Sequence, residues 1–157
     1  AHFQLLGGRL TYVPFDALID RLKSEMRRYG QQLNVSPDIV DTLGPIGGFR
    51  ARYTIHRHDT PRGTYLQVAH LELLPESHRL GEPLETALAS GSRFREKLSM
   101  VSPRRYTITV WTYPDSFDEF RKLKKELYDL GYAVAGRPLP DGMPIGASPH
   151  GSRSSAE

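Results

Sequence analysis

The sequence predicts an α+β domain: a mixed sheet of about five strands, with helices mainly on one face and a right-handed βαβ unit at the C-terminal end. Residues 48–59 alternate between apolar and polar side chains, which is typical of a half-buried strand. Apolar residues at helical spacing follow Asp16 and predict an amphipathic helix. Residues 105–139 have the pattern of a strand, a helix and a second strand, and such units are almost always right-handed with parallel strands.

The N-terminal part of the chain predicts a strand and then a helix. Residues 9–16 contain the strand, which ends at Pro14, and the carboxylate of Asp16 is placed to cap the first turn of the helix. The helix should end near Gly30, and residues 35–48 should form a connector. The buried stripe of this helix is predicted to be Leu18, Leu22, Met26, Tyr29 and Leu33.

Residues 48–59 and 64–74 predict two antiparallel strands joined by a turn that contains proline. On the first strand the apolar residues face one way, and the opposite side is basic. The apolar side consists of Phe49, Ala51, Tyr53 and Ile55. Two registers remain open, one that pairs Arg50 with Glu72 and one that pairs Ile55 with Val68.

The segment that follows predicts little regular structure. Residues 84–88 form one helical turn at most. Ser92 is placed to cap a short helix that runs through Phe94 and Leu98, and Pro103 stops that helix.

The C-terminal part predicts the βαβ unit. Residues 105–113 are β-branched and aromatic on both faces, which indicates an interior strand. Ser116 and Glu119 have the spacing of a capping box for the next helix. Gly131 should end that helix before a last strand at 132–139. The buried stripe of the helix is predicted to be Phe120, Leu123, Leu127 and Leu130.

The composition predicts a single folded domain over residues 1–157. A chain of 157 residues can bury a core without disulfides, and it contains no cysteine that could act as a nucleophile or a metal ligand. Its net charge of +3 favours anionic partners only weakly. No segment is apolar over the length of a membrane helix. Because the chain begins at Ala1 without Met, we expect it to belong to a longer protein.

A cationic stripe on the strand at 48–59 is the main candidate site. Its members are Arg50, Arg52, His56 and His58. Such a stripe can hold phosphate or a carboxylate by bidentate contacts, although exposed strands also carry Arg because its stem covers apolar surface. No metal is expected there, because His70, the natural third ligand, would lie about 10 Å from His56 at the strand rise.

Residues 139–157 are rich in Gly, Pro and Ser, and two interpretations of them remain. In the first, Pro144-Ile145-Gly146 packs back on the domain near the similar Pro45-Ile46-Gly47, and only residues 152–157 are loose. In the second, the segment wraps an anion with its backbone amides and polar side chains. The residues of that second site are Ser148, His150, Ser152 and Arg153.

Common catalytic and nucleotide-binding motifs are missing from the sequence. The glycine-rich residues 43–49 precede a strand and do not open a helix, so they predict neither a dinucleotide site nor a P-loop. Nothing arranges Ser, His and Asp as a triad, and Asp115 and Asp118 lie in the first turn of a helix, where the helix dipole explains them. We therefore expect no cofactor and no catalytic residue, with an unrecognised hydrolase as the weakest alternative.

Two stretches resemble one family of uncharacterised bacterial proteins. They are "SGSRFREKLSMVSPRRYTITVWTYPDSFDEFRKLKKELYDLGYAVAGRPLPDGMPIGASPHGS", which covers Ser90–Ser152, and "GPIGGFRARY", which covers Gly44–Tyr53. The resemblance implies a C-terminal domain that follows a membrane or coiled-coil region, with the bacterial cell envelope as the expected location and no function to carry over. More distantly, the C-terminal unit is similar to the periplasmic domains of biopolymer-transport and Tol-type proteins.

These points together predict a non-enzymatic interaction or assembly domain of a larger bacterial protein. It would bind a protein partner or a second copy of itself. The alternative is an anion or nucleic-acid binding module that uses the stripe of Arg50, Arg52, His56 and His58. Membrane association is expected only through a segment upstream of Ala1.

Overall fold

The computed structural model describes residues 1–32 and 36–147. By its contacts the chain divides into two compact units, and each is described here by itself. Unit 1 comprises residues 1–14 and 75–143, and unit 2 comprises residues 15–74 together with the C-terminal segment that begins at residue 144. Residues 15–74 of unit 2 are thus inserted into the sequence of unit 1, and the rest of unit 2 follows it. The prediction of one domain over residues 1–157 stays a prediction.

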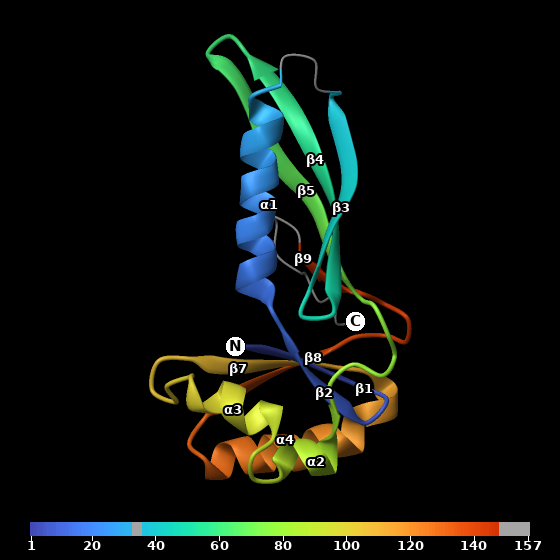
Figure 1. The fold of residues 1–157 in the computed structure, drawn as a ribbon, viewed down its shortest axis with the longest axis vertical. Coiled ribbons are helices and arrows are strands. Elements are labelled where there is room, and N and C mark those ends of the chain that lie inside the picture. Colours follow the sequence, from blue (N-terminus) through green and yellow to red (C-terminus); the bar gives the residue numbers. More distant parts are fainter. Residues whose placement is uncertain (33–35, 148–157) are drawn as a thin grey trace, which may run out of the picture. The chain divides into compact units, whose positions relative to one another are not determined.

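Unit 1 contains a five-stranded sheet in the order β6-β2-β1-β7-β8 (Figure 1). Strand β1 pairs antiparallel with β2 and parallel with β7, and β7 pairs parallel with β8. The predicted α+β fold with a mixed sheet of five strands is therefore confirmed. The strands are β1 (His2–Leu6), β2 (Arg9–Val13), β6 (Glu82–Pro83), β7 (Thr107–Thr112) and β8 (Ala133–Pro138).

Helices cover one face of this sheet (Figure 1). They are α2 (Leu84–Leu88), α3 (Arg93–Ser99), the short 3-10 helix η1 (Pro114–Ser116) and α4 (Phe117–Asp129). Alternate residues of β1 and β7 point toward them, because side chains of a strand alternate between its two faces. The resulting core includes Phe3, Leu5, Leu10, Phe94, Leu98, Ile108, Val110, Leu123 and Leu127.

The predicted ends of the helices in unit 1 are partly confirmed. Ser92 caps α3, since its Oγ accepts a hydrogen bond from the backbone N of Arg95 at 3.0 Å. The capping box of α4 is wrong: Ser116 makes no capping hydrogen bond to that helix. Its Oγ instead accepts from the backbone N of Gly8 at 3.0 Å and donates to Asp115.

Gly131 ends helix α4, as predicted. Its φ of +84° is a left-handed conformation that residues with a side chain rarely adopt. The backbone N of Tyr132 donates to the carbonyl of Leu127 at 2.9 Å, and that of Gly131 donates to Tyr128, which is the Schellman pattern. Leu127 is fully buried, whereas Leu130, predicted to continue the buried stripe, is 42% exposed.

Unit 2 contains a second sheet, of four strands in the order β3-β4-β5-β9, with helix α1 beside it (Figure 1). The sequence did not predict a separate sheet, and the prediction that residues 35–48 form a connector is wrong, because they contain the whole of strand β3. Asp16 lies inside α1, so its prediction as the helix cap is wrong, and Leu33 lies outside the described residues. The elements are α1 (Phe15–Gly30), β3 (Asp38–Ile46), β4 (Phe49–Thr60), β5 (Gly63–Pro75) and β9 (Ile145–Ala147).

The core of unit 2 lies between α1 and one face of the sheet. Leu18 and Leu22 of α1 are buried, and so are the predicted apolar positions of β4, namely Phe49, Ala51, Tyr53 and Ile55. In the described part of the chain, no helix has both the length and the apolar character needed to cross a membrane.

The described start of the C-terminal segment is the edge strand β9. Ile145 pairs with Leu73 of β5 and is completely buried, so the prediction that this segment packs back is confirmed for Ile145. Pro45-Ile46-Gly47 belongs to the end and turn of β3, and β9 lies at the opposite edge of the sheet, so the two similar tripeptides are not in neighbouring strands. The predicted anion-binding residues Ser148, His150, Ser152 and Arg153 lie outside the described residues.

Candidate functional site

The cationic stripe predicted from the sequence lies on the face of the four-stranded sheet that is turned away from α1. We call this face the open face. Antiparallel pairing of β3 with β4 places Asp38 opposite His56 and Thr42 opposite Arg52. The open face includes Asp38, Val40 and Thr42 of β3, Arg50, Arg52, Thr54, His56 and His58 of β4, and His70 and Glu72 of β5.

Arg52 is held by a carboxylate from the neighbouring strand. Its guanidinium donates from Nε to Oε2 of Glu72 at 3.0 Å, and Nη2 contacts the same oxygen. His70 Nε2 lies 3.0 Å from the other carboxylate oxygen. These hydrogen bonds, from His70 first and then from Arg52, lower the pKa of Glu72 below its ordinary value. Glu72 therefore stays ionised and joins two basic side chains.

His56 also meets a carboxylate. Its Nδ1 lies 2.5 Å from Oδ1 of Asp38, the residue directly opposite on β3. Both side chains are largely solvent-exposed, at 43% and 65%. The pair therefore stands at the surface, where its contribution to stability is small and its charge pattern is accessible to a partner.

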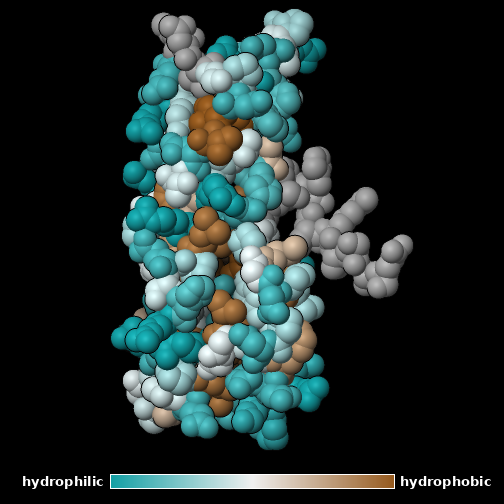
Figure 2. All heavy atoms as spheres, turned by 90° about the vertical axis from the view of Figure 1, so that its right-hand side faces the viewer, coloured by the Kyte–Doolittle hydropathy of each residue, from teal (hydrophilic) through white to brown (hydrophobic). Residues whose placement is uncertain are grey.

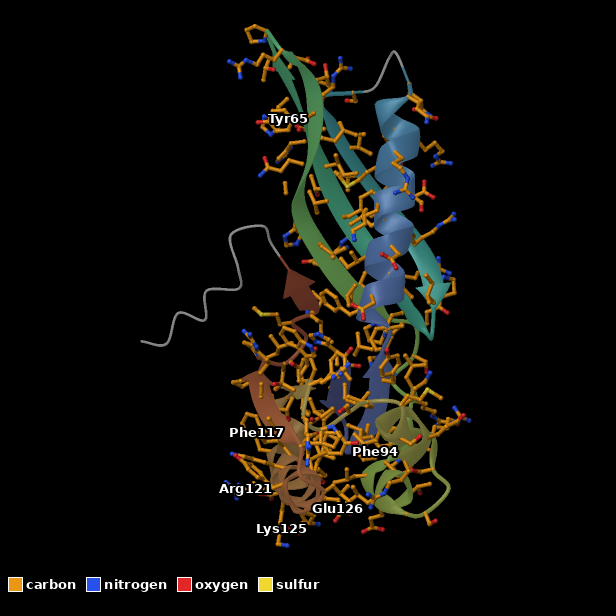
Figure 3. The ribbon with its side chains drawn as sticks, turned by 90° about the vertical axis from the view of Figure 1, so that its left-hand side faces the viewer. Tyr65, Phe94, Phe117, Arg121, Lys125 and Glu126 are labelled. Carbon is orange, nitrogen blue, oxygen red and sulfur yellow. The ribbon has the colours of Figure 1, made fainter. Side chains whose placement is uncertain are left out.

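His58 has different neighbours from the rest of the stripe. Its ring stacks on Tyr65 with 4.8 Å between centroids and 19° between planes, and its Nε2 lies 3.0 Å from Oε1 of Gln67. Tyr65 is 54% exposed, near the turn of the β4–β5 hairpin (Figure 3). His58 thus belongs to an exposed aromatic pair, 6.5 Å from the ring of His56.

Among the predicted residues, Arg52 and His56 thus each lie beside a carboxylate, and Arg50 is exposed on the same face. Asp38 was missed because it lies in a segment that the sequence predicted to be a connector. Glu72 had been considered only as a partner of Arg50. Opposite charges on strands predicted to pair were the signal that could have found it.

Both signs of charge occur on the open face as a result. Within residues 1–32 and 36–147, no three or more His, Asp and Glu side chains are grouped so that they could hold a metal ion. Val40 is 68% exposed and follows Asp38 by two positions, so an apolar side chain stands among the charged ones. Figure 2 faces the side on which β3 lies and shows polar residues over most of it, with apolar side chains in separate areas.

A polar network on the other face of the sheet fixes α1. The hydroxyl of Tyr29 donates to Oδ2 of Asp41 at 2.8 Å and lies 3.4 Å from the hydroxyl of Tyr53. The hydrogen bond from Tyr29 lowers the pKa of Asp41, and burial raises the pKa of Tyr53. Glu25, whose side chain is 11% exposed, pairs with Arg28 at 2.6 Å and also with Arg21. The contacts of Tyr29 join α1 to the sheet, whereas the ion pairs of Glu25 lie within the helix. Helix α1 therefore covers the other face of the sheet and not the open face.

Unit 1 contains a partly enclosed hollow of about 230 Å³. Two carboxylates and one ammonium group stand around three apolar side chains there, and none of the predicted site residues belongs to it. Its lining consists of Gly8, Pro83, Leu84, Glu85, Leu88, Glu119 and Lys122.

Comparison of the chain with protein-family models, with curated proteins and with solved structures gave no match.

Proposed function

We propose that the protein is a non-enzymatic interaction and assembly domain, and that the open face is the surface through which it binds a protein partner. The observation that carries this proposal is the interleaving of opposite charges: Glu72 stands between Arg52 and His70, and Asp38 stands beside His56. The carboxylates of Glu72 and Asp38 would repel a uniform polyanion from this surface. A protein surface with charges of both signs can match it, and such matching fixes partner choice and orientation.

A second copy of the chain is the partner to test first. In a two-fold symmetric contact the same patch serves on both subunits, so each patch must be complementary to itself. A face that carries cations and carboxylates side by side meets this condition, because rotation by a half turn can place each cation opposite a carboxylate. Val40, 68% exposed, supplies an apolar group in the same patch.

Analytical ultracentrifugation over a wide concentration range tests this assembly. We expect the wild type to associate reversibly, and Val40→Glu to weaken the association by about tenfold or more, since a charge would then be buried in the contact. Phe117→Glu is the matched control, because Phe117 is also exposed, at 42%, and lies at the start of α4 in unit 1 (Figure 3). A wild type that is monomeric at every concentration would contradict assembly through the open face.

Binding of an anion or a nucleic acid is the second candidate function. The stacked pair of His58 and Tyr65 favours it, since an exposed aromatic ring beside cations can stack on a base. A mobility shift with single-stranded oligonucleotides tests it. Salt-sensitive binding that disappears in Arg50→Ala/Arg52→Ala supports this function, and binding that is unchanged in that variant removes it.

A further inference from the structure

Four large apolar side chains are exposed at one end of unit 1. Met100 (68%) and Tyr106 (56%) belong to the loop between α3 and β7. Tyr128 (61%) and Leu130 (42%) lie at the end of α4. Groups of exposed apolar residues on a soluble protein usually mark an interaction site. We call the surface formed by these residues, together with Arg104 and Arg105, the tip surface.

Tyr132 joins the two chain segments of the tip surface. Its hydroxyl lies 3.0 Å from the carbonyl oxygen of Leu98, in the last turn of α3, and 3.0 Å from that of Val101, in the loop that follows. Tyr106 and Tyr132 are neighbours across the sheet, because the residues that follow them, Thr107 and Ala133, pair between β7 and β8. In Figure 1 both segments lie at the end of unit 1 where β7 begins. The two segments that carry the exposed side chains are therefore held together by hydrogen bonds and by strand pairing.

The tip surface is also basic. Arg104 and Arg105 are exposed, and their guanidinium groups make no ion pair with another described residue. Lys124 adds a third cation, with its Nζ 6.0 Å from the centroid of the Tyr128 ring. The carboxylate of Asp129 is already paired, since Lys125 Nζ lies 2.8 Å from its Oδ2. A partner that carries negative charge is therefore complementary to this surface.

We propose that the tip surface binds the anionic surface of a lipid bilayer. Each kind of side chain there has a place at such an interface: arginine pairs with lipid phosphates, tyrosine lies at headgroup level, and the aliphatic side chains of Met100 and Leu130 enter the acyl region. A nucleic acid would use the arginines and the rings but would leave both aliphatic side chains in water. This contact is separate from the open face, which lies in unit 2, and does not depend on the function proposed for that face.

Vesicle co-sedimentation of the full chain tests the proposal. The vesicles are pure phosphatidylcholine, or phosphatidylcholine with about 30% phosphatidylglycerol. We expect binding to the anionic vesicles only, and Arg104→Glu/Arg105→Glu should weaken it by about tenfold or more. Arg62→Glu/Arg79→Glu is the matched control, because it makes the same change in net charge at two exposed arginines outside the tip surface and should retain binding within about twofold.

The apolar part of the surface is tested separately. Met100→Ser/Leu130→Ser should weaken binding at high salt as well as at low salt, and Met100→Leu should retain it, because burial of apolar groups is not screened by ions. Unchanged thermal unfolding of the variants shows that they are folded. The proposal is overturned if the wild type does not bind anionic vesicles at low salt, if the control loses binding equally, or if the chain binds single-stranded DNA through Arg104 and Arg105 and ignores the vesicles.

Discussion

Tyr29 is the residue through which α1 reaches two strands of its sheet. Its hydroxyl donates to Asp41 on β3 and lies 3.4 Å from the hydroxyl of Tyr53 on β4. The helical spacing of the sequence predicted that Tyr29 faces the core, but its role as a hydrogen-bond donor depends on Asp41, which the sequence placed in a connector. Glu25 is similar: it is buried and paired with two arginines, although a lone Glu in a helix gives no such signal.

Replacing Tyr29 by Phe should lower the free energy of unfolding by about 1 kcal/mol, because Asp41 loses one of its two donors and the buried hydroxyl of Tyr53 loses a partner. Urea denaturation measures this difference. Tyr65→Phe removes a hydroxyl from a ring that is 54% exposed and should leave the stability unchanged. If the two variants have the same free energy of unfolding, the hydrogen bonds of Tyr29 make no specific contribution to stability.

Glu72 should make the protein sensitive to acid. Its pKa in the folded state is lowered from the ordinary value of 4.5 by hydrogen bonds from His70 and Arg52, the two basic side chains in contact with it. A lowered pKa stabilises the fold above the unfolded-state value, and this stabilisation is lost as the pH falls through the folded-state value. The stability advantage of the wild type over Glu72→Gln should therefore shrink as the pH falls below about 4.5. Thermal unfolding across this pH range is the measurement, and an advantage that does not change with pH would contradict it.

At the scale of elements, the end of a helix can be predicted from the sequence when it depends on the backbone conformation of one residue. Gly131 ends α4 because its φ of +84° requires glycine, and this was readable from its place after the apolar stripe. The capping box at Ser116 failed because the serine hydroxyl bonds to Gly8 at the β1–β2 turn. The spacing of residues cannot show that competing partner, which comes from a part of the chain more than a hundred residues away.

A pair of glycine substitutions tests whether the positive φ of Gly131, and not only its place at the end of a helix, requires glycine. Gly131→Ala should destabilise the protein by about 1–2 kcal/mol through backbone strain alone, because no heavy atom would meet the added Cβ within 4 Å. Gly30→Ala is the control: Gly30 ends α1 without a positive φ and with equally open space, so alanine should be neutral or stabilising there. Chemical denaturation of both variants gives the comparison, and a tolerated Gly131→Ala would refute the strain.

At the scale of the whole molecule, unit 1 is built from two segments of the chain that are far apart in sequence. Strand β1, from the N-terminal segment, lies inside the sheet between β2 and β7. Leu5 of β1 is fully buried in the core that the helices of the other segment complete. The fold of unit 1 therefore requires residues 1–14 to pack against residues 75–143, although residues 15–74 separate them in the sequence.

Trp111, the single tryptophan of the chain, reports on this contact. It lies in β7, is 7% exposed, and its Nε1 donates to Nδ1 of His2 on β1 at 3.3 Å. Leu5→Ala should lower the unfolding free energy followed by tryptophan fluorescence by about 2–5 kcal/mol, because it leaves a cavity in this core. Leu130→Ala, at a position that is 42% exposed, should cost much less. A small loss from Leu5→Ala would show that β1 is dispensable for the sheet.

The sequence by itself determined the features that depend on neighbouring residues. These are the buried side of β4, the stripe of α1 as far as Leu22, the strand–helix–strand order around α4, and the glycine that ends that helix. Periodicity and turn chemistry are local, so they can be read from one segment without knowledge of its partners.

Only the tertiary structure decided how the strands are grouped and what surrounds the basic stripe. β3 is a strand because β4 pairs with it, and that pairing brings Asp38 to His56; the hairpin with β5 brings Glu72 to Arg52. Electrostatic surroundings depend on distance in space, and residues many positions apart in sequence set them here. A stripe that looks purely cationic in the sequence thus becomes a surface of alternating charge in the fold.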